Sequence, residues 1–119
     1  MVVIAMSVKL KDVYRAEHSI AKAAAEDQNL EGPAVPTGKV VRLESLYAVD
    51  LTTAGKTVRL GYARAGVNYW FKRNGSGASG YGAALDQPII LVEGEKPIAR
   101  VESATANDEL LMVASGVYL

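Results

Sequence analysis

The segment at residues 75–80 carries a glycine pattern known from nucleotide-binding sites. Gly75, Gly77 and Gly80 match the spacing G-x-G-x-x-G. In a dinucleotide site these glycines close a turn from a strand into a helix, and the N-terminus of that helix binds the pyrophosphate. Here only a short segment separates the glycines from Pro88 and a further apolar run. Because this leaves no room for the helix, the sequence predicts a glycine-rich hairpin loop.

Two other short motifs resemble parts of ligand sites. The segment 54–57 (AGKT) looks like the end of a phosphate-binding loop, but Asp50 occupies the position of the first glycine and would repel a phosphate. Glu93 and Glu95 flank Gly94, and paired carboxylates can act as acid and base or bind calcium. The second motif offers too few oxygen ligands for a calcium loop. We expect both motifs to be turns, the second one solvated.

The chain contains no cysteine and a single histidine, His18. This composition excludes thiol nucleophiles, zinc–thiolate sites, disulfides and metal sites built on two histidines. His18 lies in a polar stretch, so we expect it to be solvated and not catalytic. No catalytic, cofactor-binding or metal-binding residue is predicted, and the chain is expected not to be an enzyme.

The charge and length limit the possible partners. Lys and Arg number 13, as do Asp and Glu, so the formal net charge is zero. A general nucleic-acid binder normally carries a basic patch, so no nucleic-acid partner is expected. No apolar run approaches the roughly 20 residues of a membrane span, so no membrane partner is expected either. The 119 residues, 50% of them hydrophobic, suffice for one modest core.

The N-terminal third differs in composition from the remainder. Residues 7–28 contain many helix-forming residues and neither glycine nor proline. This predicts a helix over part of residues 12–28, with an extended arm as the alternative, because the first apolar residues also fit a period of two. Residues 29–38 are rich in proline and glycine and predict a connector. Residues 1–37 are therefore expected to form an N-terminal arm or short helix with its connector.

From residue 38 onward the hydrophobic period is two, as in half-buried strands. The expected strands are residues 39–50, 56–64, 67–73, 88–92, 98–103 and 109–119. Strands joined by short turns, with no helical segment between them, predict a mainly β chain with an antiparallel, jelly-roll-like β-sandwich over residues 38–119. The residues expected in its core are Val41, Leu43, Tyr47, Val49, Val58, Leu60, Tyr62, Ile90, Val101 and Leu111.

The densest aromatic cluster is Tyr69-Trp70-Phe71. Strand alternation puts Tyr69 and Phe71 on one face and Trp70 on the other. An exposed Trp70 would mark a protein interface or a platform for sugars; the alternative is that the glycine loop or the N-terminal segment covers it. The residues predicted for an interface are Tyr14, Ile20, Trp70 and Tyr81.

A wider order of turns and strands carries a resemblance. Its pieces lie at Val35–Lys39, Thr52–Val58, Leu91–Glu95 and Ala104–Tyr118. They comprise a Pro-x-Gly-Lys entry to a strand, a TT-x-G-x-T-V hairpin, an EGE turn between strands, and a small-residue turn before a final strand ending G-V-Y. This order resembles small β-sandwich virion proteins of tailed bacteriophages.

The resemblance implies a non-enzymatic structural protein of the virion, assembled in the host cytoplasm. Its most specific form is a capsid decoration or cement protein that docks between subunits of the major capsid protein and stabilises the head. It also implies a homo-oligomer, with a trimer as the first expectation. A neck, tail or baseplate component is the alternative within the virion. A carbohydrate-binding sandwich that uses Trp70 is the alternative outside it.

Overall fold

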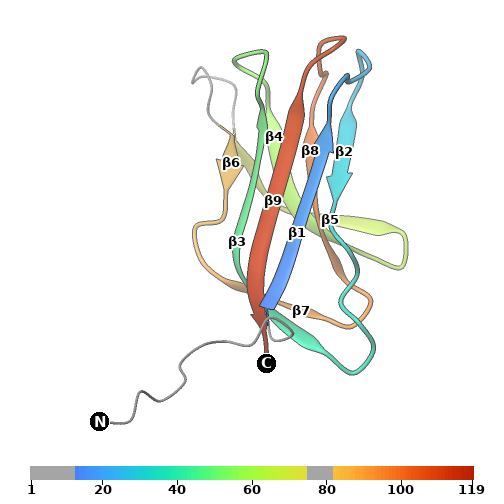
Figure 1. The fold of residues 1–119 in the computed structure, drawn as a ribbon, viewed down its shortest axis with the longest axis vertical. Helices are drawn as coiled ribbons and strands as arrows, with labels where there is room; N and C mark the ends of the chain where they lie inside the picture. Colours follow the sequence, from blue (N-terminus) through green and yellow to red (C-terminus); the bar gives the residue numbers. More distant parts are fainter. Residues whose placement is uncertain (1–12, 75–81) are drawn as a thin grey trace.

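The computed structural model describes residues 13–74 and 82–119, and every regular element within them is a β-strand (Figure 1). The strands are β1 (Val13–Ile20), β2 (Gln28–Glu31), β3 (Val40–Asp50), β4 (Val58–Arg64), β5 (Val67–Asn74), β6 (Ala83–Ala84), β7 (Ile89–Val92), β8 (Lys96–Val101) and β9 (Leu110–Tyr118). The prediction of a mainly β chain is confirmed. In the part of the chain that is described, no helix is long and apolar enough to cross a membrane.

The helix predicted over part of residues 12–28 is wrong. These residues contain β1, which pairs antiparallel with β9 along its whole length. Tyr14 and Ala16 point inward and are buried, whereas Arg15 and Glu17 are exposed, which is the period of a strand. The alanine-rich segment that favoured a helix follows β1 and forms part of the connection to β2. Pairing with β9 therefore overrides the local helix propensity.

The strand pairs are nested around the β4–β5 hairpin. β1 pairs with β9, β2 with β8, β3 with β6 and β7, and β4 with β5. These pairs form one long two-stranded ribbon. β3 also pairs with β9, and β4 with β8, and these contacts fold the ribbon into two sheets. The result is a first sheet in the order β1-β9-β3-β6, with β7 also on β3, and a second sheet in the order β2-β8-β4-β5. Figure 1 shows the two layers, and the predicted jelly-roll-like sandwich is confirmed.

Residues 13–37 belong to this sandwich and do not form a separate arm. Tyr14 of β1 and Leu30 of β2 lie in the core. The connector continues the pairing of β2 with β8, since the backbone N–H of Val35 donates to the carbonyl of Glu95 at 2.9 Å. The boundary predicted between residues 37 and 38 is therefore not a boundary between an arm and a domain, because the described residues before it are part of the sandwich.

The core lies between the two sheets. The predicted core residues that are buried are Val41, Leu43, Val49, Val58, Leu60 and Val101. Tyr62 and Leu111 are half-buried. Tyr47 and Ile90 are 39% and 53% exposed, so the prediction is wrong for both. Ile90 lies opposite Arg42 on the outer face, and its neighbour Leu91 takes the core position.

A β-bulge in β3 explains the exposure of Tyr47. The register of β3 on β9 shifts between Leu43 and Ser45, which leaves Glu44 as an extra residue. Beyond the bulge the alternation of faces is displaced by one residue. Leu46 therefore points into the core and Tyr47 points outward.

Candidate functional site

The outer face of the first sheet carries a group of exposed apolar side chains. Tyr47 and Val113 lie directly opposite each other on β3 and β9, and each is nearly two-fifths exposed. Ile90 and Val92 on β7 are exposed further along the same face, with Arg42 and Ser45 between them and the first pair. We call this surface the apolar face; it consists of Tyr47, Ile90, Val92, Leu111, Val113 and Val117. An exposed apolar surface on a sheet is typical of a protein docking site.

Polar groups interrupt the apolar face at its centre and along β1. The hydroxyl groups of Ser45 and Ser115 hydrogen-bond to each other at 2.8 Å. Arg15 lies beside Ser115, and Glu17 lies beside Val113. These side chains surround an open hollow of about 430 Å³, lined by Arg15, Ala16, Glu17, Val113, Ala114 and Ser115. The first sheet thus offers a broad surface with a shallow depression next to its edge strand.

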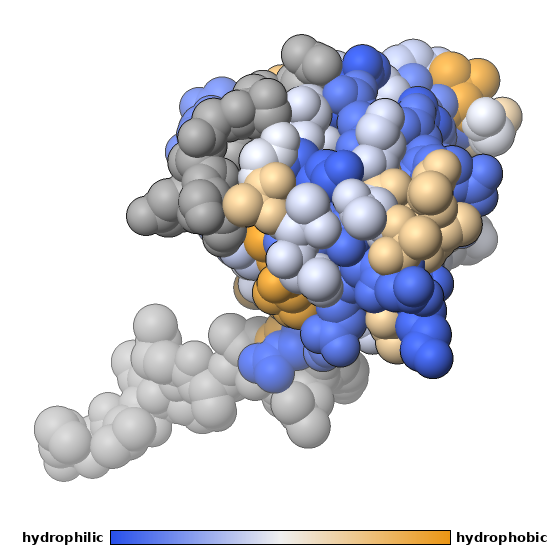
Figure 2. Space-filling model, turned by 90° about the horizontal axis from the view of Figure 1, so that it is seen from above, coloured by the Kyte–Doolittle hydropathy of each residue, from blue (hydrophilic) through white to orange (hydrophobic). Residues whose placement is uncertain are grey.

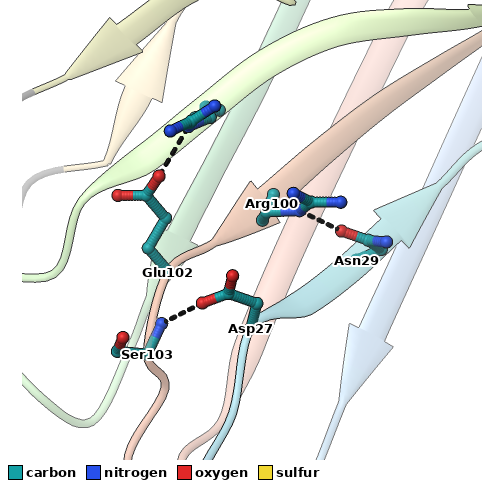
Figure 3. A network of polar contacts seen from close by, with 6 residues as sticks. Asp27, Asn29, Arg100, Glu102 and Ser103 are labelled. Carbon is teal, nitrogen blue, oxygen red and sulfur yellow. Dashed lines mark hydrogen bonds and ion pairs between the residues drawn. The ribbon is translucent and has the colours of Figure 1, made fainter. Parts of the chain in front are cut away.

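The outer face of the second sheet carries charged groups that bind one another. Arg59 of β4 lies opposite Arg100 of β8, so two like charges are cross-strand neighbours. The Arg59 Nε donates to a carboxylate oxygen of Glu102 at 2.5 Å, and the Arg100 Nε donates to the Asn29 side-chain carbonyl at 2.7 Å. Figure 3 shows this network, in which Asp27 also accepts a hydrogen bond from the backbone N–H of Ser103. The network satisfies its own charges within one chain.

Trp70 lies on the same outer face of the second sheet, where it is half-buried. The guanidinium carbon of Arg100 lies 5.1 Å from the centroid of the indole ring, a cation–π contact. A groove of about 320 Å³ runs beside the ring, lined by Arg59, Trp70, Phe71 and Lys72. Arg100 covers one face of the ring that a sugar would use for stacking.

A second bulge shapes the strand that carries Trp70. The register of β4 on β5 shifts between Leu60 and Gly61, which leaves Phe71 as the extra residue. A Cβ atom on Gly61 would lie 2.1 Å from the carbonyl oxygen of Tyr69, so only glycine fits there. Phe71 and Tyr69, predicted to share a face opposite Trp70, are 40% and 43% exposed on this edge strand. Tyr69 stacks on Tyr62 with a centroid distance of 5.1 Å.

Two buried carboxyl groups meet at the end of the sandwich where β3 leads into β4. Asp50 and Asp108 are 5% and 1% exposed. Thr53 links them, since its backbone N–H donates to Asp50 Oδ1 at 2.9 Å and its hydroxyl donates to Asp108 Oδ1 at 2.7 Å. Asp50 Oδ2 is buried and accepts no hydrogen bond from the described residues. The surface of this end is mostly hydrophilic (Figure 2).

The pKa values of the two carboxyl groups shift in opposite directions. Burial raises the pKa of Asp50, and its hydrogen bond with Asp108 raises it further. The same hydrogen bond lowers the pKa of Asp108. Of the two carboxyl groups, Asp50 therefore binds a proton more readily than Asp108. Nearby Lys56 also favours the charged form of Asp108, and its ammonium group donates to the Ser103 carbonyl at 2.6 Å. This pair fastens two turns together and lies apart from the grooves.

The structure scatters the predicted interface residues. Tyr14 is 2% exposed, and its hydroxyl donates to the Pro33 carbonyl at 2.6 Å, so the prediction of an interface role is wrong for this side chain. Ile20 packs against the core at the end of β1 and is half-buried. Trp70 lies on the opposite sheet, and Tyr81 lies outside the described residues. The four do not form one surface.

The other sequence motifs act in the fold. The segment 54–57 contains a turn in which Gly55 has a φ of 78°. His18 Nδ1 accepts a hydrogen bond from the backbone N–H of Glu31 at 2.9 Å, so this histidine links the two sheets. The solvated turn predicted at residues 93–95 is wrong for Glu95, which is 6% exposed and accepts a hydrogen bond from the backbone of Val92. The glycine motif at residues 75–80 lies outside the described residues.

The sequence matches no protein-family model and no curated protein. Sequence reasoning missed the apolar face, because Tyr47 and Ile90 were assigned to the core. Val113 was open to prediction, since it alternates with Met112 and Ala114 in the final strand.

Proposed function

We propose that this chain is a non-enzymatic structural protein of a tailed-phage virion, most specifically a capsid decoration or cement protein. Its work is to dock on subunits of the major capsid protein and to add contact area that holds the head together. The observation that carries the proposal is the apolar face of the first sheet. Tyr47, Val113, Ile90 and Val92 expose between 37% and 53% of their surface on one side of a rigid sheet.

The physical case for docking is the free energy of hydration. Apolar surface removed from water contributes roughly 25 cal/mol per Å². A stable interface buries about 800 Å² on each partner, so a broad sheet face suits the task better than a loop. Val113 lies in a strand paired on both sides, by β1 and β3, and therefore presents a surface that loses little conformational entropy on binding.

The architecture also supports a virion role. Jelly rolls occur in viral capsid proteins and in lectins. The order of turns and strands that resembles small virion proteins spans β3, the connection from β3 to β4, and the strands from β7 to β9. The turn at residues 52–57, expected in a hairpin, instead connects the first sheet to the second. These strands include β3, β7 and β9 of the first sheet and β8 of the second. The proposed location is accordingly the assembled virion.

The test is co-sedimentation with heads of the encoding phage that were assembled without this protein. The wild-type chain should pellet with the heads, whereas Val113→Glu and Ile90→Glu should lower the affinity about tenfold or more, because each buries a charge. The matched control is Leu51→Glu, which changes a 55% exposed leucine outside the apolar face. This variant should bind as the wild type does.

Two results would speak against the proposal. Failure of the wild-type chain to bind heads would remove the decoration role, and binding to isolated necks, tails or baseplates would move the protein to those parts. Loss of head binding in Leu51→Glu but not in Val113→Glu would place the docking surface elsewhere. Circular dichroism spectra of all variants establish that they are folded.

A carbohydrate-binding module is the second candidate, favoured by the groove beside Trp70 and by the occurrence of the fold in lectins. A glycan array read with the wild-type chain and with Trp70→Ala tests it. Binding of a sugar that is lost in the variant would establish this function. No bound sugar would leave Trp70 as a structural partner of Arg100.

A further inference from the structure

The outer strands of the two sheets differ in how well they resist pairing with another chain. β2, β6 and β7 are short, with 4, 2 and 4 residues. β5 has 8 residues, but it contains a bulge and the cationic Lys72, and both features discourage edge pairing. β1 also has 8 residues, and its register on β9 shows no shift. Among the described residues, β1 pairs with β9 on one side only. β1 is therefore the long, regular and unprotected edge.

The charges on β1 favour one register with a second copy of itself. Arg15 and Glu17 are both exposed on the outer face and flank Ala16. In an antiparallel β1–β1 pair centred on Ala16, each Arg15 lies opposite the Glu17 of the other copy. Opposite charges in directly opposed positions stabilise a sheet, and like charges destabilise it.

The neighbouring registers are unfavourable. A shift that keeps the faces matched would place either Arg15 opposite Arg15 or Glu17 opposite Glu17. An intermediate shift would place outward residues opposite inward ones, and would expose the side of β1 that carries Tyr14. The sequence of this edge is thus self-complementary in one register.

We propose that β1 pairs with β1 of a second copy of this chain, antiparallel and around a two-fold axis at Ala16. The proposed partner is a second copy because this register places Arg15 of each copy opposite Glu17 of the other, which gives two ion pairs. The expected product is a dimer in which the two first sheets become one continuous sheet. This self-pairing stands without the proposed virion function.

The dimer would also strengthen docking of the kind proposed above, and this step rests on the proposed function. A two-fold axis perpendicular to a sheet leaves the outer faces of both copies on the same side. The two apolar faces would then form one double-width surface, with the two hollows next to the axis. Two linked docking faces bind a repeating lattice more tightly than one, through effective concentration.

Light scattering coupled to size exclusion tests the pairing. The wild-type chain should have twice the 12.6 kDa mass of one chain at micromolar concentration. Arg15→Glu and Glu17→Arg should each weaken the dimer about tenfold or more, because each places two like-charged pairs in contact. The double variant Arg15→Glu with Glu17→Arg should restore the dimer, because it exchanges the charges. Arg42→Glu, on the same face but on β3, should not change the mass.

A cysteine experiment reports the register independently, since the chain has no cysteine of its own. Mixing the Arg15→Cys chain with the Glu17→Cys chain under oxidising conditions should give a covalent dimer, and either chain alone should give much less. A wild-type monomer, a trimer, or a dimer that both single charge variants leave unchanged would overturn the proposal. Failure of the double variant to restore the dimer would overturn the register. Head binding is measured separately, so a failed virion role leaves the dimer result intact.

Discussion

The outer faces of the two sheets differ in whether their exposed side chains find partners within the same chain. On the second sheet, Arg59 and Arg100 are satisfied by Glu102, Asn29 and the ring of Trp70. On the first sheet, Tyr47, Val113 and Ile90 have no such cover and remain in contact with water. Both arginines of the second face therefore have their partners within the same chain. The first face gains stability only when another molecule covers it.

The cost of each face differs accordingly. Cross-strand arginines repel each other, so the second face depends on its network to offset that repulsion. Exposed valine and isoleucine side chains lower the stability of an isolated fold only slightly, because the fold merely lacks the free energy that their burial would contribute. Substitutions on the second face should therefore change stability, and substitutions on the first face should change association.

The largest effect is expected in the core that both faces share. Leu60 is fully buried, and Leu60→Ala should lower the free energy of unfolding by about 2–5 kcal/mol, the range for emptying a packed leucine site. Tyr47→Ser on the apolar face should change it by less than about 0.5 kcal/mol. Urea denaturation of both variants measures the difference. Equal costs would mean that Tyr47 is part of the core after all.

The bulge that positions Trp70 should be the next most sensitive place. Gly61→Ala would force a Cβ against the Tyr69 carbonyl, which should cost about 1–3 kcal/mol, as overpacking does. Gly38→Ala serves as a comparison: its added Cβ meets no atom within 4 Å, so only its positive φ is strained. A Gly61→Ala variant as stable as the wild type would show that the bulge is not fixed by this glycine.

The carboxyl pair predicts a dependence of stability on pH. The raised pKa of Asp50 gives stability that is present below the ordinary Asp pKa of 3.8 and is lost as pH rises through the folded value. The lowered pKa of Asp108 gives stability that is present above 3.8 and is lost as pH falls through its folded value. Asp50→Asn should therefore remove the loss of stability that occurs as pH rises through the folded pKa of Asp50. Thermal melts across acidic to neutral pH measure it, and an unchanged profile would contradict the raised pKa of Asp50.

A small effect on stability is expected from the cation–π contact on the second face. Arg100→Ala should lower the free energy of unfolding by about 0.5–1 kcal/mol. The same variant should bind phage heads as the wild type does, because its face is not the docking face. Chemical denaturation and co-sedimentation, run in parallel, separate the two effects. Loss of binding without loss of stability would mean that the second face, and not the first, is the docking face.

Much of the fold followed from alternation, and the errors have local causes. The strands from residue 39 onward, apart from the two-residue β6, could be predicted, because apolar and polar residues alternate along most of each. β1 could not, because its charged residues and the alanine-rich segment that follows it favour a helix, and only pairing with β9 selects the extended form. The exposure of Tyr47 depends on one extra residue at Glu44, and no sequence signal marks that bulge. The apolar face was therefore hidden, although its members are ordinary strand residues.

Cysteine footprinting on the bound protein tests the difference between the faces most directly. Val113→Cys places a thiol on the apolar face, and Asn68→Cys places one on the exposed edge strand β5 of the second sheet. In the free protein both thiols should react with a maleimide. On phage heads, the thiol of Val113→Cys should be protected and that of Asn68→Cys should react as before. Protection of Asn68→Cys alone, or equal reactivity of both on the heads, would contradict docking through the first sheet.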